Sequence, residues 1–440
     1  MAVTALASRR FIADLQPAAS ETSMSAHTLV RGWIYRLRVL AKSTFIVVRD
    51  CSGELQCVAA TEDVKALHLK LEDCVELVGE CVPEARATGG RELRVRSARV
   101  LNPAGHALPF QSSTDLEEVG MEALLEYRPL AARNAHVGDV FRLQAEILQY
   151  ARTFLREQRF TEIITSKLVA SGTEGGTHLF PIEYFERSAY LAQSPQFYKE
   201  HGVAAFERVF EFGHVYRAEP HASSRHLTEY YSLDFEFGFI DGPEDVIEME
   251  RQLLHYVFER IASEHVSLLS RYRQAPLPDL RRAPVWSFEH CLSLLAEVHA
   301  RSDLRDDLDP LAERQLCAIA QQQCGVAAVF VLGFPLSSRP FYSAPRGDSG
   351  AAQSFDLLLE GVEITSGGQR LHRRADLEAA LLARNMDPAG FAAHLRMFDL
   401  GMPPHGGFAI GLERLTAQVL GLRNVREAVL YPRDRYRLTP

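Results

Sequence analysis

Long apolar runs are absent from this sequence of 440 residues. No stretch approaches the roughly 18 consecutive apolar residues of a membrane-spanning helix, although 47% of the residues are hydrophobic. Residues 1–27 place Arg9, Arg10, Asp14 and Glu21 among small side chains, without the continuous apolar core of a secretory signal. We therefore expect a cytoplasmic protein that has no membrane partner.

Cysteine is scarce and irregularly spaced. The sequence contains seven cysteines, an odd number, and no two of them form a Cys-x-x-Cys pair. This spacing argues against a disulfide framework and against a structural zinc site. We expect most of the cysteines to be small, buried apolar side chains.

A basic excess is also lacking, since the formal net charge is −9. The charge is unevenly distributed, however. Residues 1–105 carry 14 Lys and Arg against 12 Asp and Glu, a net charge of +2. Because the total is −9, residues 106–440 carry a net charge of −11. The first hundred residues are therefore the better candidate for contact with a polyanion.

Short β-rich segments separated by turn residues fill residues 28–100. Five such segments in about 75 residues predict a small closed barrel of the OB type. We assign residues 1–105 to this barrel domain and residues 106–135, which follow a proline-containing stretch, to a linker or hinge. The five predicted strands are 30–35, 45–49, 54–58, 74–79 and 92–96.

Residues 136–440 combine long helices with further strands. Apolar side chains recur at helical spacing over 143–155 and 246–261. We predict one α+β domain in which helices flank a mainly antiparallel sheet. Its strand-like segments are 161–169, 207–217, 229–240, 327–332, 353–365 and 406–411.

The most informative motif is a predicted hairpin that carries arginines and carboxylates. Arg217-Ala218-Glu219 ends one predicted strand, and Arg225-His226-Leu227 precedes the next. Two arginines on opposite sides of a turn can clamp phosphate oxygens, because each guanidinium is a planar fork of donors with a permanent charge. The pattern predicts a nucleotide triphosphate site, although a surface hairpin with ion pairs would have the same pattern.

Two further clusters suit an amino-acid substrate and a metal ion. Thr173-Glu174-Gly175-Gly176, together with Gln196-Phe197-Tyr198-Lys199, could hold a zwitterion, because Glu174 can accept from an ammonium and Lys199 can meet a carboxylate. Glu363 and Ser366 offer oxygen ligands to Mg²⁺, with Arg370 following a Gly-Gly turn. Each cluster by itself could also be an ordinary loop or strand end.

The last cluster is a glycine-flanked apolar segment that leads into a helix beginning near Leu412. Arg414 falls in the first turn of this helix, where the helix dipole favours negative charge. A phosphate at the helix start would interact favourably with both the N–H groups and Arg414. The conflict between charge and dipole therefore indicates a functional residue.

Together these motifs resemble those of the class II aminoacyl-tRNA synthetases, subclass IIb, and more narrowly the archaeal-type aspartyl-tRNA synthetases. The resemblance covers nearly the whole chain, from the barrel to residues 426–434. Arg217-Ala218-Glu219 with Arg225-His226-Leu227 resembles motif 2 of the family, and Gly411-Leu412-Glu413-Arg414 resembles motif 3.

The resemblance implies specific roles for these residues. Arg217, Arg414 and Glu363 would be catalytic, and Glu363 and Ser366 would bind Mg²⁺. The aspartate site would contain Glu174, Gln196, Phe197, Tyr198, Lys199, Arg217, Ser366 and Arg370, with Lys199 and Arg370 on the side-chain carboxylate. The ATP site would contain Arg217, Ala218, Glu219, Arg225, His226, Leu227, Glu363, Gly411, Leu412, Glu413 and Arg414.

The implied reaction joins L-aspartate to tRNA through an aspartyl-adenylate. The barrel would bind the anticodon through Tyr35, Phe45, Gln56 and Pro83. In archaeal-type relatives, tryptophan at the position of Tyr35 and lysine at that of Pro83 accompany restriction to tRNA-Asp. The residues present here therefore favour an enzyme that charges both tRNA-Asp and tRNA-Asn.

Motif 1 departs from the family pattern, because residues 160–167 place Ser166 where the family has proline. That motif builds the dimer interface, and we still expect a homodimer. Three alternatives stay open: a synthetase restricted to tRNA-Asp, an asparaginyl-tRNA synthetase, and a paralogue that binds nucleic acid or aspartate without charging tRNA. Lys199 argues against the second, and the intact Arg217, Glu363 and Arg414 argue against the third.

Overall fold

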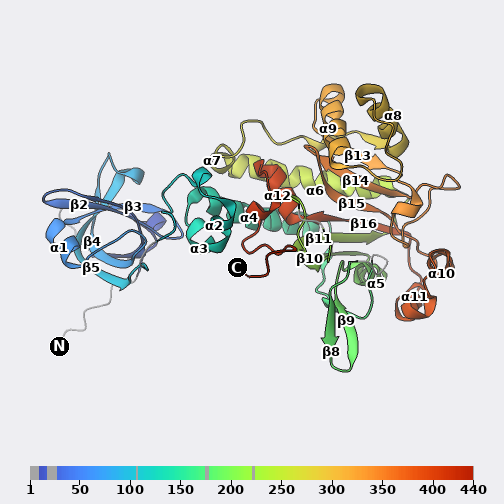
Figure 1. Cartoon of the computed structure of the whole chain (residues 1–440), viewed down its shortest axis with the longest axis horizontal. Helices are drawn as coiled ribbons and strands as arrows, with labels where there is room; N and C mark the ends of the chain where they lie inside the picture. Colours follow the sequence, from blue (N-terminus) through green and yellow to red (C-terminus); the bar gives the residue numbers. More distant parts are fainter. Residues whose placement is uncertain (1–8, 17–26, 106–107, 174–177, 221–222, 440) are drawn as a thin grey trace. The chain divides into compact units, whose positions relative to one another are not determined.

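The computed structural model describes residues 9–16, 27–105, 108–173, 178–220 and 223–439 (Figure 1). The chain divides into two compact units, 1–135 and 136–440. Each unit has a hydrophobic core of its own. Among the described residues, no helix combines the length and the apolar character that crossing a membrane requires.

The first unit contains the predicted five-stranded barrel, which is confirmed. The strands close in the order β1-β2-β3-β5-β4. Alternate residues of β2, such as Ile46 and Val48, are buried inside the barrel, as the two-residue period of a strand requires. The elements are β1 (Thr28–Val39), β2 (Ser43–Arg49), β3 (Glu54–Ala60), α1 (Thr61–Ala66), β4 (Cys74–Pro83) and β5 (Arg91–Asn102).

The segment predicted as a linker contains two short helices, α2 (Met121–Glu126) and α3 (Arg128–Ala131). Buried Glu72 of the barrel ties this segment down: its carboxylate accepts hydrogen bonds from Ser112 and, over 3.0 Å, from Arg133. The Arg133 guanidinium also lies 4.7 Å from the centre of the Trp33 ring. These contacts explain why the segment belongs to the first compact unit.

The second unit is built on an eight-stranded sheet of order β12-β13-β14-β15-β16-β11-β10-β6. Only the β12–β13 and β10–β6 pairs are parallel, so the predicted mainly antiparallel sheet is confirmed. The strands are β6 (Thr161–Glu162), β10 (Arg208–Tyr216), β11 (Glu229–Gly238), β12 (Val285–Ser287), β13 (Ala328–Leu332), β14 (Ser354–Leu359), β15 (Val362–Gln369) and β16 (His405–Gly411).

The prediction of one continuous strand over 161–169 is wrong. β6 joins the large sheet, whereas β7 (Leu168–Val169) joins β8 (Pro181–Tyr184) and β9 (Arg187–Leu191) in a separate three-stranded sheet. Side chains interrupt the strand, because Thr165 and Lys167 both bind the buried Glu211. Ser166 hydrogen-bonds locally, donating to the Leu168 carbonyl over 3.0 Å.

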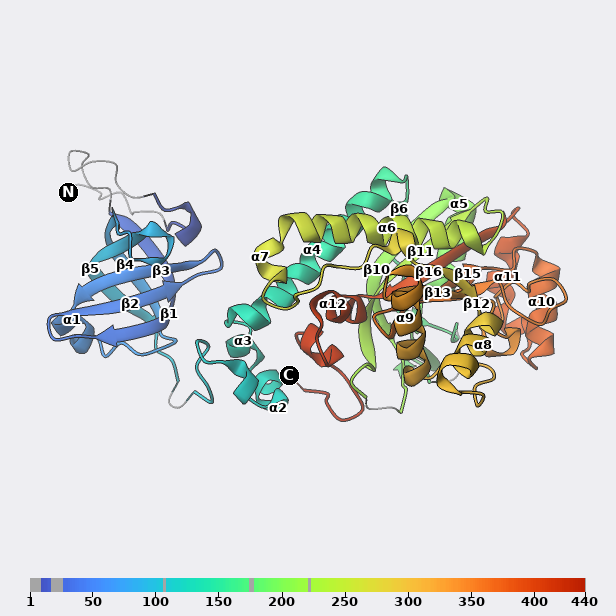
Figure 2. The ribbon, with the colours of Figure 1, turned by 90° about the horizontal axis from the view of Figure 1, so that it is seen from above.

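Two long helices pack on the large sheet (Figures 1 and 2). They are the predicted α4 (Ala135–Glu157) and α6 (Pro243–Glu264), and both are confirmed. Their apolar stripes share one core with the aromatic side chains of Phe210, Phe235 and Phe408. The other helices are α5 (Gln196–Phe206), α7 (Val266–Leu269), α8 (Phe288–His299), α9 (Pro310–Cys324), α10 (Arg374–Ala383), α11 (Ala392–Phe398) and α12 (Leu412–Leu420).

Candidate active site

The predicted hairpin is formed by β10 and β11, which pair in antiparallel register from Arg208–Phe237 to Tyr216–Glu229. The backbone N–H of Arg217 extends this pairing by donating to the Thr228 carbonyl over 2.9 Å. This hydrogen bond fixes the position at which Arg217 leaves the sheet. Its guanidinium carbon lies 5.8 Å from the centre of the Tyr230 ring on the opposite strand.

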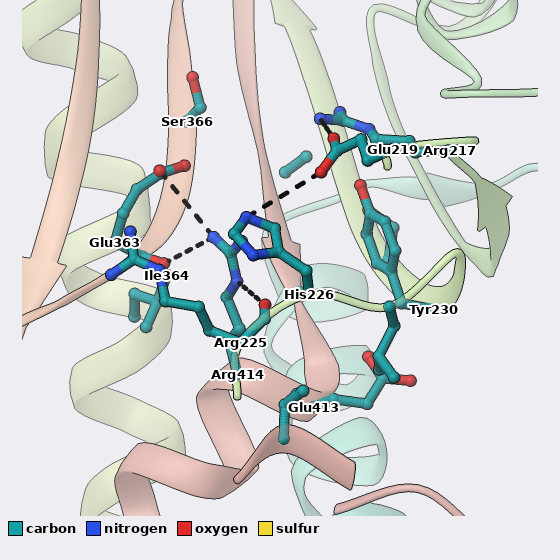
Figure 3. Close-up of a pocket in the computed structure, with 15 residues that line it drawn as sticks. Arg217, Glu219, Arg225, His226, Tyr230, Glu363, Ile364, Ser366, Glu413 and Arg414 are labelled. Atoms are coloured by element: carbon teal, nitrogen blue, oxygen red, sulfur yellow. Dashed lines mark hydrogen bonds and ion pairs between the residues drawn. The ribbon is translucent and has the colours of Figure 1, made fainter. Parts of the chain in front are cut away.

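Separate stretches of the chain line one pocket, which we call the arginine pocket (Figure 3). The hairpin contributes Arg217 and Arg225, β15 contributes Glu363, and the start of α12 contributes Arg414. Of the residues predicted for ATP, Ala218 and Leu412 do not line it. The full predicted set that the pocket contains is Arg217, Glu219, Arg225, His226, Leu227, Glu363, Gly411, Glu413 and Arg414.

Arg225 is held by a carboxylate that sequence reasoning missed. Its two terminal nitrogens donate to Glu313 of α9 over 2.9 and 2.7 Å. Burial opposes the charge of Arg225, but the hydrogen bonds and attraction of Glu313 outweigh burial, so the pKa of Arg225 is raised. Glu313 also accepts the backbone N–H of Glu363 over 3.0 Å, and it thus fixes two walls of the pocket.

Arg414 occupies the first turn of α12, which begins at Leu412 as predicted. Its guanidinium donates to the carbonyls of Glu363 and Arg225 over 3.0 and 3.3 Å (Figure 3). Neighbouring Glu413 accepts the Tyr231 N–H over 2.9 Å, and burial raises the pKa of Glu413 to about 7. The arginine pocket therefore gathers three cations around the start of a helix.

A β-bulge brings Glu363 and Ser366 to the same pocket. Residues three apart on a regular strand point to opposite faces. In β15, however, Glu363 pairs with Leu358 and Thr365 with Leu357, so Ile364 is an extra residue without a partner in the ladder. Both oxygen-bearing side chains consequently line the arginine pocket.

A second pocket, which we call the lysine pocket, contains Gln196, Lys199, Arg217, Ser366 and Arg370 from the predicted aspartate set. Arg217 and Ser366 line both pockets, so the two pockets are adjacent. Glu174 lies outside the described residues.

Helical geometry separates the four consecutive residues predicted from α5. Gln196 and Lys199, three positions apart, face the lysine pocket. The Phe197 ring instead stacks on His394 at 4.1 Å and meets Phe341 edge-on. Tyr198 packs edge-on against His201. Phe197 and Tyr198 therefore support the helix from positions outside the pocket lining.

Two cations of the lysine pocket, Lys199 and Arg370, are buried and paired with carboxylates of β11. Lys199 is 1% exposed, and its Nζ lies 3.0 Å from Asp234 and 3.4 Å from Glu236. Arg370 donates to Glu236 over 3.0 Å and to the Gly407 carbonyl over 3.0 Å. Burial opposes the charge of Arg370, yet nearby Glu236 raises its pKa. In the sequence, Asp234 and Glu236 alternate with apolar residues, and this alternation is the pattern that places both carboxylates on one face of β11.

Arg339 is a further buried cation at the lysine pocket that sequence reasoning missed. It donates to both oxygens of Asp356 over 2.9 and 2.7 Å and to the Ser366 hydroxyl over 3.3 Å. Its guanidinium carbon lies 3.8 Å from the centre of the Phe334 ring. The Arg339–Asp356 pair fixes Ser366. These three residues are too far apart in the sequence for a local motif to indicate that they meet.

The antiparallel sheet, the arginine-bearing hairpin and the arginine at the start of the last sheet-packed helix define a class II aminoacyl-tRNA synthetase. The family model of the class II tRNA synthetases (D, K and N) matches residues 120–435, and the OB-fold nucleic acid binding domain matches residues 28–101.

Named relatives narrow the assignment. The chain is 42% identical to the aspartate–tRNA(Asp/Asn) ligase of Deinococcus radiodurans, over 93% of this chain and 95% of that one. It is 39% identical to the enzyme of the same name from Aeropyrum pernix, over 98% and 99%. The asparaginyl-tRNA synthetase structure from Pyrococcus horikoshii with asparaginyl-adenylate superposes with a TM-score of 0.87 at 29% identity, covering 94% and 96%. The chain belongs to the aspartate–tRNA ligases of class II.

Proposed function

We propose that this enzyme joins L-aspartate to ATP as aspartyl-adenylate and transfers the aspartyl group to both tRNA-Asp and tRNA-Asn in the cytoplasm. The observation that carries the proposal is the pair of adjacent pockets, one with three arginines and one with buried Lys199 and Arg370. Arg217 lines both pockets, at the junction where the two substrates would react.

The chemistry requires positioning more than a protein nucleophile. A carboxylate oxygen of aspartate attacks the α-phosphorus, and the bond from that phosphorus to pyrophosphate breaks. The terminal tRNA hydroxyl then attacks the aspartyl carbonyl carbon, and AMP leaves. Arg217 would hold the substrate carboxylate and the α-phosphate together, while Arg225 and Arg414 would bind the remaining phosphates.

Mg²⁺ fits the donor set at the arginine pocket. Glu363 and Ser366 supply two oxygen ligands from one face of β15, and phosphate oxygens and waters would complete the shell. No group of three or more His, Cys, Asp or Glu able to hold a metal occurs among the described residues. An ion bound here would neutralise charge on the triphosphate.

Asparagine is the alternative amino acid, because structures with that specificity share the fold. The lysine pocket favours aspartate. Lys199 and Arg370 are two buried cations that would meet the substrate side chain, and a cation attracts a carboxylate more strongly than a neutral amide. We therefore assign aspartate as the substrate.

The barrel offers a hollow for an anticodon base. Tyr35, Phe45 and Gln56 line it, and Arg36 and Arg38 supply positive charge. A stacking ring, a hydrogen-bonding amide and cations are what single-stranded RNA recognition uses.

Pro83, the fourth predicted anticodon residue, pairs with Arg91 at the end of β4 and does not line the hollow. The names of the Deinococcus radiodurans and Aeropyrum pernix relatives include both tRNAs and support charging of tRNA-Asn. Aspartylation of purified tRNA-Asp and tRNA-Asn transcripts tests the proposal.

We also infer a homodimer that forms through the motif 1 segment. Ile164 is 95% exposed beside β6, and Phe239 at the end of β11 is 74% exposed. We expect the wild-type enzyme to sediment at about twice its chain mass of 49.3 kDa, and Ile164→Asp to sediment as a monomer.

Leu382→Asp is the matched control for the dimer, because Leu382 is 62% exposed on α10. This variant should remain dimeric. A wild-type monomer, or an Ile164→Asp variant that stays dimeric, would contradict the inference.

A further inference from the structure

Glu313 is a buried carboxylate that contacts two residues of the arginine pocket without lining the pocket itself. It lies on α9 and is 3% exposed. Its two oxygens accept hydrogen bonds from the terminal nitrogens of Arg225 over 2.7 and 2.9 Å, and Oε2 also accepts the backbone N–H of Glu363 over 3.0 Å. A ligand in the pocket would therefore meet Arg225 and Glu363, which Glu313 holds, rather than Glu313.

The first turn of α9 fixes the place of Glu313. Asp309 caps this helix and accepts two backbone N–H groups of the first turn over 3.0 and 2.8 Å. Arg301 donates to both oxygens of Asp309 over 2.9 and 2.7 Å, and Pro310 starts the helix with a suitable backbone angle. The helix dipole also favours a carboxylate in the first turn. Glu313 is thus presented from a well-anchored helix end.

Glu313 closes a ring of contacts with three residues that line the arginine pocket. Arg414 donates to the backbone carbonyls of Arg225 and Glu363 over 3.3 and 3.0 Å (Figure 3). Glu313 binds the side chain of Arg225 and the backbone N–H of Glu363. Both residues are therefore held twice, once by a cation and once by an anion. The ring joins the hairpin, β15, α9 and the start of α12.

The contact with Glu313 leaves donors of Arg225 for a ligand. A guanidinium has five N–H donors, and Glu313 takes one from each terminal nitrogen. One donor on each terminal nitrogen and the Nε–H remain. Among the described residues, the buried Nε has no hydrogen-bond partner, although buried polar groups normally have one. Arg225 can therefore bind phosphate oxygens while Glu313 still holds it.

Glu363 is a competing partner for Arg225. Burial opposes the charge of Arg225, whereas Glu313 and, more weakly, Glu363 raise its pKa. Without Glu313, Glu363 would remain as a carboxylate that attracts the guanidinium. Glu363 is also a proposed ligand of Mg²⁺, so Arg225 would then compete with the metal ion for the same oxygens.

We propose that Glu313 is a positioning residue for the triphosphate, because it holds the Arg225 guanidinium in place before ATP binds and keeps it away from Glu363. The inference rests on the proposed function, since it takes ATP as the ligand of the arginine pocket. A side chain that is already held loses less conformational freedom on binding, so ATP binds more tightly. The negative charge of Glu313 acts in the opposite direction, but Arg225 pairs with it and Glu313 does not line the pocket.

Glu313→Gln keeps the size of the side chain and removes its charge. We expect this variant to raise the KM for ATP about tenfold in aspartate-dependent ATP–pyrophosphate exchange. The KM for aspartate should change less than about twofold, because neither Glu313 nor Arg225 lines the lysine pocket. A KM for ATP that is unchanged or lower than that of the wild type would overturn the proposal.

A double-variant cycle tests whether Glu313 acts through Arg225. Arg225→Ala alone should raise the KM for ATP about thirtyfold, because charged hydrogen bonds to phosphate are lost. In the Arg225→Ala background, Glu313→Gln should change the KM for ATP less than about twofold, since the side chain that Glu313 holds is gone. A purely structural role predicts the same rise in both backgrounds, through Glu363 and α9. Equal rises would therefore contradict the proposal.

Glu313→Asp is a second variant that keeps the negative charge beside Arg225, so it tests the proposal even if Glu313→Gln does not fold. Aspartate is one methylene shorter and holds the guanidinium less well. We expect the KM for ATP to rise about threefold while the KM for aspartate stays unchanged. A KM for ATP equal to that of the wild type, or a larger rise in the KM for aspartate, would count against the proposal.

Glu72→Gln is the matched control for loss of a buried carboxylate that pairs with an arginine. Glu72 belongs to the first unit, is 4% exposed and pairs with Arg133 over 3.0 Å. This variant should lower thermal stability without changing either KM, and a rise in the KM for ATP as large as that of Glu313→Gln would overturn the proposal. A wild-type enzyme without aspartate-dependent exchange would refute the proposed function itself, whereas an active wild type with equal rises in the cycle would refute only the role of Glu313.

Discussion

Replacement of Arg217 with lysine should reduce kcat/KM for aspartate-dependent ATP–pyrophosphate exchange by about a thousandfold. Arg217 lines both pockets and is the side chain that would touch the reacting carboxylate and the α-phosphate. Lysine keeps the charge but loses the planar fork that binds two oxygens at once. The loss should fall mainly on kcat, because the contact to the α-phosphate strengthens as the transition state forms.

The matched control is Arg281→Lys, an exposed arginine of the same unit that pairs with Asp279. It should leave exchange and thermal unfolding unchanged. Exchange by Arg217→Lys within about fivefold of wild type would contradict the assigned role, since loss of a bidentate transition-state contact costs far more.

Replacement of Lys199 with methionine should reduce exchange with aspartate at least about a hundredfold. Methionine keeps the length of the side chain but removes the ammonium that would face the substrate carboxylate. It also leaves Asp234 and Glu236 short of one buried cation, a change that costs about 3 kcal/mol of folding stability. Exchange with aspartate should fall far more than exchange with asparagine, so the variant should discriminate less between the two amino acids.

Binding of ATP to the Lys199→Met variant separates the site effect from unfolding. The arginine pocket does not contain Lys199, so ATP affinity measured by calorimetry should stay within about threefold of wild type. An unchanged preference for aspartate over asparagine would show that Lys199 does not select the substrate.

Local patterns predicted the parts of the site that depend on neighbouring residues. The hairpin that carries Arg217 and Arg225 follows from two strand patterns and a turn. The start of α12 follows from a glycine before an apolar helical pattern. Both features need no information from distant residues.

Partners far apart in sequence could not be predicted in this way. Glu313 binds Arg225 from 88 residues away, and no motif around Glu313 marks it as part of the site. The bulge at Ile364 depends on how β14 pairs with β15. Adjacency in the sequence groups Phe197 with the predicted substrate residues, whereas helical periodicity turns it away from the lysine pocket.

The most direct test of the proposed function is aspartylation of two purified transcripts, tRNA-Asp and tRNA-Asn, with ATP and Mg²⁺ and with asparagine as the control amino acid. We expect both transcripts to accept aspartate and neither to accept asparagine. Charging of tRNA-Asp alone would contradict the dual tRNA specificity, and charging with asparagine would contradict the assignment of the lysine pocket to a carboxylate.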